Sequence, residues 1–147
     1  MSKKTRVRRP KQYETLMNDL CRGENSVFDT FADLLVFSAV LGAHRNVSKP
    51  FEKTSEAVQF HIFSSDIYQT VFNTIALKHA AFDPTIMGNE NLDEKIGVFE
   101  EYAHGGLEIL ATNLDNSPPE TYQDKILNLM LRSERKNSIL NDITGLA

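Results

Sequence analysis

The sequence has little of what secreted and membrane-spanning proteins carry. A single cysteine, Cys21, stands among 147 residues, so no internal disulfide can form. No apolar stretch approaches the roughly eighteen residues of a membrane-spanning helix. The basic start of the chain meets Pro10 and Lys11 instead of the apolar core of a signal peptide. These absences predict a cytoplasmic protein with no membrane partner.

Signatures of catalysis and of cofactor binding are missing as well. The chain has no phosphate-binding glycine loop, no Walker sequence and no nucleophile elbow. None of the four histidines has a second histidine or a cysteine three or four positions away, the spacing of a metal-binding pair on a helix. Cys21 falls near the C-terminal end of a predicted helix, where the helix dipole raises the pKa of a thiol. We therefore expect no cofactor, no metal and no nucleophilic cysteine.

Acidic residues are absent from the first eleven positions, which hold six of the sixteen basic residues. These six are Lys3, Lys4, Arg6, Arg8, Arg9 and Lys11. The remainder, 12–147, contains ten basic and twenty acidic residues, so a strongly acidic body follows a cationic leader. Such asymmetry is typical of proteins that bind a polyanion. We interpret the six residues as a nucleic-acid-binding arm, with a solvated tail as the alternative.

Apolar periodicity predicts a mainly α fold: a single compact domain of about five helices, with at most a minor strand element and a basic N-terminal arm. The helices are expected at about 10–21, 30–43, 66–82, 92–113 and 120–132. The domain limits are 1–11 for the arm, 12–132 for the helical domain and 133–147 for a C-terminal tail. The third helix is expected to bury Ile67, Val71, Phe72, Ile75 and Phe82.

Two further segments complete the expected fold. Residues 44–57 are polar, contain Pro50 and are typical of a loop. Val58, Phe60 and Ile62 alternate with polar residues at the period of a strand.

The predicted helix at 30–43 is apolar on nearly every side. Within 31–41 only Asp33 and Ser38 are polar. A helix of this kind must be covered all round, either at the centre of a bundle or at a subunit interface. We expect Leu34, Leu35 and Phe37 to be buried in either case, and we expect a homo-oligomer.

Gly105 and Gly106 interrupt the predicted fourth helix, at a cost of about 2 kcal/mol relative to two alanines. The apolar periodicity continues through them, so the helix itself is expected to continue. We interpret the pair as a place where another helix or strand approaches closely. A kink and a backbone that contacts a ligand are the alternatives.

The same helix carries Glu100, Glu101, His104 and Glu108 within about two turns. Carboxylates beside an imidazole can perform acid–base catalysis. We interpret the group instead as a solvated acidic helix face with one histidine.

Three blocks of the chain together resemble a known bacterial family. They are 8–14 (RRPKQYE), 30–42 (TFADLLVFSAVLG) and 98–110 (VFEEYAHGGLEIL). Their order and spacing resemble the DNA phosphorothioation-associated (Dnd system-associated) protein four family across roughly 6–115. The resemblance implies a small cytosolic protein of systems that place sulfur in the DNA backbone and restrict unmodified phage DNA. It implies no catalytic residues.

We therefore expect a non-enzymatic accessory protein of a DNA phosphorothioation and phage-defence system. It would bind DNA through the basic arm, or other proteins of the defence system, or both. One alternative is a transcriptional regulator, because a basic strand followed by helices at 10–21 and 30–43 is similar to a ribbon-helix-helix repressor, although the loop at 22–29 is longer. The other is a nuclease or another enzyme that uses the Glu/His cluster.

Overall fold

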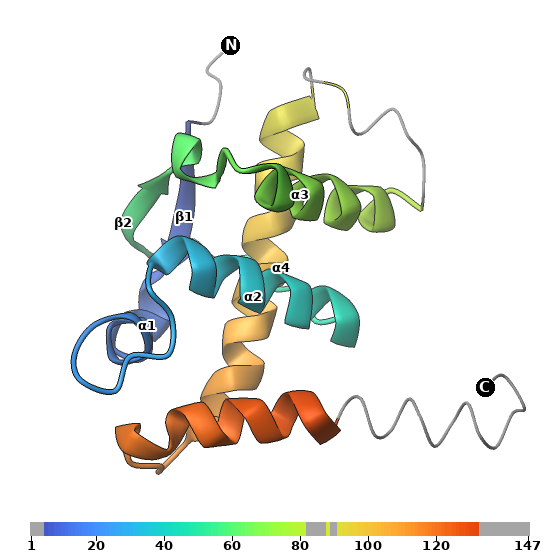
Figure 1. The fold of residues 1–147 in the computed structure, drawn as a ribbon. Coiled ribbons are helices and arrows are strands. Elements are labelled where there is room, and N and C mark those ends of the chain that lie inside the picture. Colours follow the sequence, from blue (N-terminus) through green and yellow to red (C-terminus); the bar gives the residue numbers. More distant parts are fainter. Residues whose placement is uncertain (1–4, 82–87, 89–90, 133–147) are drawn as a thin grey trace, which may run out of the picture.

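Helix α4 (Leu92–Leu114) is the axis around which the other elements are arranged (Figure 1). The computed structural model describes residues 5–81, 88 and 91–132. In chain order the helices before α4 are α1 (Glu14–Cys21), α2 (Phe31–Arg45) and α3 (Asp66–His79), and a fifth helix follows over 122–132. The strands are β1 (Arg6–Pro10) and β2 (Thr54–Gln59), and short 3-10 turns lie at Lys11–Tyr13, Phe60–Phe63 and Pro119–Thr121.

This architecture confirms the predicted mainly α domain with five helices and a minor sheet. Both α2 and α3 lie across α4, and the last helix crosses near its C-terminal end (Figure 1). In the part of the chain that is described, no helix has the length and apolarity needed to span a bilayer. The predicted tail, 133–147, lies outside the described residues.

The backbones of α2 and α4 are in direct contact at glycines. A Cβ atom added to Gly106 would collide with the carbonyl oxygen of Ser38 on α2. One added to Gly105 would collide with the carbonyl oxygen of Val47, just beyond α2. On the facing helix, a Cβ on Gly42 would collide with the carbonyl oxygen of Tyr102. The predicted close approach at Gly105 and Gly106 is therefore confirmed.

The two strands form an antiparallel ribbon with Arg6 opposite Gln59 and Pro10 opposite Thr54. The prediction of a strand through Val58, Phe60 and Ile62 was wrong in position, and the expected loop at 44–57 ends in β2. After Gln59 the chain turns, because Phe60 and Phe63 both pack on Phe72 of α3, with ring centroids 5.4 Å apart in each pair. A 3-10 turn places side chains at i and i+3 on one side, whereas a strand does not.

Burial on α2 and α3 agrees with the prediction with three exceptions, Phe37, Ile67 and Val71. Leu34 and Leu35 are fully buried as predicted, whereas Phe37 is only half-buried and packs on Phe28. Ile67, expected in the core, is 74% exposed. Five positions separate it from buried Phe72, about 140° around the helix, so it points to another side. Val71 is half-buried, Phe72 and Ile75 are buried, and Phe82 lies outside the described residues.

We expect Gly106→Ala to destabilise the protein by at least about 2 kcal/mol, because the added methyl group meets backbone on α2 that cannot move away. Helix propensity alone predicts the opposite sign, a gain of about 1 kcal/mol. Urea unfolding measures the change. Glu94→Ala, at an exposed position of α4, is the control and should alter stability by no more than about 0.5 kcal/mol. A stabilised Gly106→Ala protein would contradict the close contact.

Candidate nucleic-acid interface

The six residues predicted to bind nucleic acid are divided by the structure. Lys3 and Lys4 lie outside the described residues. Arg6 and Lys11 are exposed at the two ends of β1, whereas Arg8 is half-buried and Arg9 is only 4% exposed. Residues 6–10 of the predicted arm are thus a strand of the sheet. The four described cations have different surroundings, which decide what each can bind.

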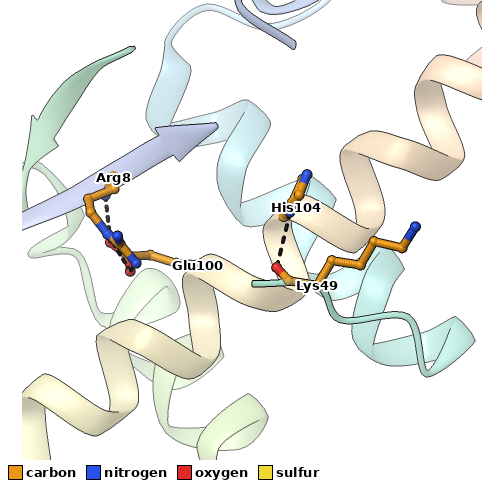
Figure 2. A network of polar contacts seen from close by, with 4 residues as sticks. All are labelled: Arg8, Lys49, Glu100 and His104. Carbon is orange, nitrogen blue, oxygen red and sulfur yellow. Dashed lines mark hydrogen bonds and ion pairs between the residues drawn. The ribbon is translucent and has the colours of Figure 1, made fainter. Parts of the chain in front are cut away.

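Arg8 binds the buried carboxylate of Glu100 on α4 (Figure 2). The backbone N–H of Arg8 donates to Glu100 Oε2 at 2.7 Å, and the guanidinium donates to Oε1 through Nη2 at 2.9 Å and Nε at 3.1 Å. The guanidinium also lies 4.9 Å from the centre of the Phe51 ring. Glu100 is 1% exposed, and a buried carboxylate needs a compensating charge, which Arg8 supplies. Its carboxylate partner makes Arg8 a poor candidate for a phosphate contact.

Arg9 is also held within the fold. Its Nε donates to the carbonyl oxygen of Glu56 at 2.6 Å, and its guanidinium lies 4.1 Å from the centre of the Phe31 ring on α2. Arg22 lies over the same ring at 4.7 Å. Burial lowers the pKa of Arg9, because desolvation disfavours the charged form. Arg9 therefore connects the ribbon to α2 and does not present its charge to solvent.

A third exposed cation, Lys53, lies beside Lys11 at the end of β1, and it was not identified from the sequence. The backbone N–H of Lys11 donates to the carbonyl oxygen of Lys53 at 3.0 Å, and both side chains are exposed. Lys11 and Lys53 are 42 positions apart in the sequence. Only the pairing of β1 with β2 brings them together, and no local pattern announces that pairing.

Lys11 and Lys53 border a pocket of about 720 Å³. The pocket is lined by Pro10, Lys11, Gln12, Pro50, Phe51, Glu52, Lys53 and His104. His104 of α4 is 7% exposed, and its ring lies 5.1 Å from that of Phe51 and 5.6 Å from that of Tyr13. Because a carbonyl oxygen can only accept, His104 Nδ1 must donate to the Lys49 oxygen 3.0 Å away (Figure 2).

The interpretation of Glu100, Glu101, His104 and Glu108 as a solvated face was wrong for two of the four. Glu100 and His104 are buried, because the sheet and the segment around Lys49 cover this side of α4. Glu108 pairs with Lys49 Nζ at 2.6 Å, and the Glu101 carbonyl oxygen accepts from Lys49 N–H. Three of the four thus contact Lys49, whereas Glu100 binds Arg8. The described residues contain no group of three or more His, Cys, Asp or Glu that could hold a metal.

Cys21 is half-buried at the end of α1, and its Sγ lies 3.5 Å from the carbonyl oxygen of Thr30. Desolvation by burial raises the pKa of this thiol to about 11, so it is protonated at neutral pH. The expected direction of the pKa shift is confirmed. Its principal cause is burial, whereas the sequence suggested the helix dipole.

The arrangement of a ribbon-helix-helix repressor is not present. In such proteins the first strand pairs with the same strand of a second chain. Here β1 pairs with β2 of its own chain, and its remaining edge meets Glu100 through the Arg8 N–H. The predicted order of one strand followed by two helices is present. The expected pairing of that strand with a second chain was wrong.

Comparison with known proteins gives one result. A family model described as DNA sulphur modification system-associated protein 4 matches residues 6–144, a range that begins at β1 and includes every described helix. No curated protein and no solved structure matches the chain.

Proposed function

The chain belongs to the family of DNA sulphur modification system-associated protein 4, and on that premise we propose that it is a non-enzymatic accessory protein that binds duplex DNA. The family description supports an accessory role in a system that acts on DNA. The observation that carries the proposal is the group of exposed cations at the ends of β1, namely Arg6, Lys11 and its neighbour Lys53. None of the three makes an ion pair with another described residue.

The spacing of these cations suits a DNA backbone. Lys11 follows Arg6 by five positions along extended chain, about 17 Å at 3.4 Å per residue. This length corresponds to roughly five nucleotide steps of one strand of a duplex. Lys3 and Lys4 would add two contacts. Of the six cations predicted from the sequence, only Arg8 and Arg9 are then excluded, because both are bound within the fold. With Lys53 the remaining four make five phosphate contacts, which give a salt slope of about −4.5, compared with about −5.4 for six.

The different surroundings of the cations also decide how DNA binding should be tested. Deleting 1–11 would remove Val7 and Pro10, both fully buried, and would damage the fold together with the charge. Exchange of exposed side chains alone avoids that loss.

We expect the double variant Arg6→Gln/Lys11→Gln to bind duplex DNA roughly 60-fold more weakly at 0.1 M salt. The slope of log K against log salt should become less steep by about 1.8, since each lost phosphate contact no longer releases about 0.9 counterion. Fluorescence anisotropy across a salt series measures both quantities. Arg22→Gln/Arg45→Gln removes the same charge elsewhere and is the matched control. Equal losses in the two double variants would mean that only net charge matters and would refute the assignment to β1.

We also propose that two copies associate through the groove between α2 and α3. The groove has a volume of about 310 Å³ and is lined mainly by apolar groups of Val40, Ala43, Val71 and Ile75. Val40 is 47% exposed, so one chain leaves part of α2 uncovered. Helix α3 begins with Asp66 and ends with Lys78 and His79. An antiparallel contact between two α3 helices about a twofold axis would therefore bring opposite charges together. Other proteins of the system are the second class of partner.

Light scattering at micromolar concentration tests self-association. We expect a mass near two chains for the wild type and near one chain for Val40→Asp, because the dimer would have to desolvate a carboxylate against an apolar surface. Leu127→Asp is the matched control, since Leu127 is 51% exposed on the last helix and lies outside the groove. A wild-type mass near one chain that does not change with concentration would contradict the dimer.

A further inference from the structure

We propose that a cleft at the C-terminal end of α4 binds a phosphate oxyanion, through residues that belong to the acidic body and not to the basic start of the chain. The cleft has a volume of about 640 Å³. It is lined by Thr112, Asn113, Lys125, Asn128, Leu131 and Arg132. The proposal adds a second anion site to the interface on β1.

The last helix is held in a defined rotation against the rest of the fold. Its buried side chains are Tyr122, Ile126 and Leu129, spaced at i, i+4 and i+7. This apolar stripe fixes which residues the helix presents on either side. Lys125, Asn128 and Arg132, at i, i+3 and i+7, form a neighbouring stripe along one face. That stripe meets Thr112 and Asn113 of α4 across the cleft.

Among the described residues, no carboxylate lines the cleft. Its described polar lining consists of one lysine, one arginine, two asparagines and a threonine. In a body with twice as many acidic as basic residues, this selection is unusual. Asp124 lies on the same helix but does not line the cleft, because one residue turns the side chain by about 100°. The helix thus separates its positive residues from its neighbouring negative ones.

The two cations have only neutral hydrogen-bond partners among the described residues. Lys125 Nζ donates to the Ser117 hydroxyl, and Arg132 Nη2 is 3.5 Å from Asn113 Oδ1, the outer limit of a hydrogen bond. Neither forms an ion pair within the described part of the chain, whereas Arg8 and Lys49 each pair with a glutamate. Two positive charges that no described carboxylate neutralises, in one concave site, attract an anion.

The donor set favours a phosphate over a simple halide or a carboxylate. A guanidinium offers several N–H donors in one plane, an ammonium offers three, and the Asn128 amide offers two. Together they can satisfy several oxygens of one tetrahedral anion through charge-assisted hydrogen bonds. The volume leaves room for the rest of a nucleotide or for a stretch of nucleic-acid backbone.

The location of the cleft is compatible with one duplex that also meets β1. His104, beside the pocket of Lys11 and Lys53, lies eight residues before Thr112, about 12 Å along α4. This part of the inference rests on the proposed DNA binding, whereas phosphate binding in the cleft does not. Free phosphate and backbone phosphate are chemically the same ligand here, so the experiment has an arm for each.

The first arm is an NMR titration of the full chain with inorganic phosphate at constant ionic strength. We expect saturable shifts of the Asn113 and Asn128 side-chain amides. Asn128→Asp, which places a carboxylate in the cleft and removes neither cation, replaces one of these two probes and should abolish the saturable shifts of the other, Asn113. Gln123→Glu makes the same change of charge at an exposed position of the same helix outside the cleft and should preserve them.

The second arm measures the salt dependence of duplex binding by Lys125→Gln/Arg132→Gln. A slope less steep by about 1.8 assigns the DNA backbone as the source of the phosphate, whether or not free phosphate binds. Saturable phosphate shifts with an unchanged slope assign a small phosphate compound instead. Absence of both effects would overturn the proposal. The Arg6→Gln/Lys11→Gln variant is measured in parallel, so that failure of the β1 interface and failure of the cleft can be told apart.

Discussion

A buried carboxylate is the constraint on which the arrangement of this protein depends. Glu100 lies at the centre of α4 with 1% of its surface exposed, and a buried charge without a partner is strongly destabilising. Arg8 provides that partner through its side chain and its own backbone N–H. The contact brings β1 against α4 and occupies one edge of the strand. The same constraint leaves Arg6 and Lys11 at the exposed ends of β1.

Patterns of neighbouring residues predicted the helices well, because they report local physics. Thr30 accepts the N–H of Asp33 at the start of α2, and a threonine is a preferred residue at the N-terminus of a helix. Gly105 and Gly106 also predicted a close approach, since two glycines inside a continuing helix need a compensating contact. Ile67 was misplaced because apolar character alone does not specify the buried side of a helix, which depends on the elements packed against it.

Contacts between distant segments could not be predicted in the same way. Strand β2 pairs with β1 across more than forty residues, and no local signal identifies the partner of a short strand. The basic run at the start of the chain predicted a positive charge, but it could not tell which cations face solvent. Arg8 and Arg9 are bound inside the fold. Lys125 and Arg132 were overlooked for the opposite reason. The chain around them has nearly as many acidic as basic residues, so its net charge gives no signal. Only the folded helix places the basic residues on one face and Asp124 on another.

Hydrogen exchange at the Arg8 amide tests most directly whether Glu100 holds the basic segment in the fold. The N–H donates to the buried carboxylate at 2.7 Å, so in the wild type its exchange should be at least about a hundredfold slower than in an unstructured peptide. Glu100→Gln, which removes the charge at nearly constant volume, should accelerate this exchange more than that of amides in α4. Exchange of the wild-type Arg8 amide at the rate of an unstructured peptide would mean that the basic segment is a free arm and would contradict its anchoring by Glu100.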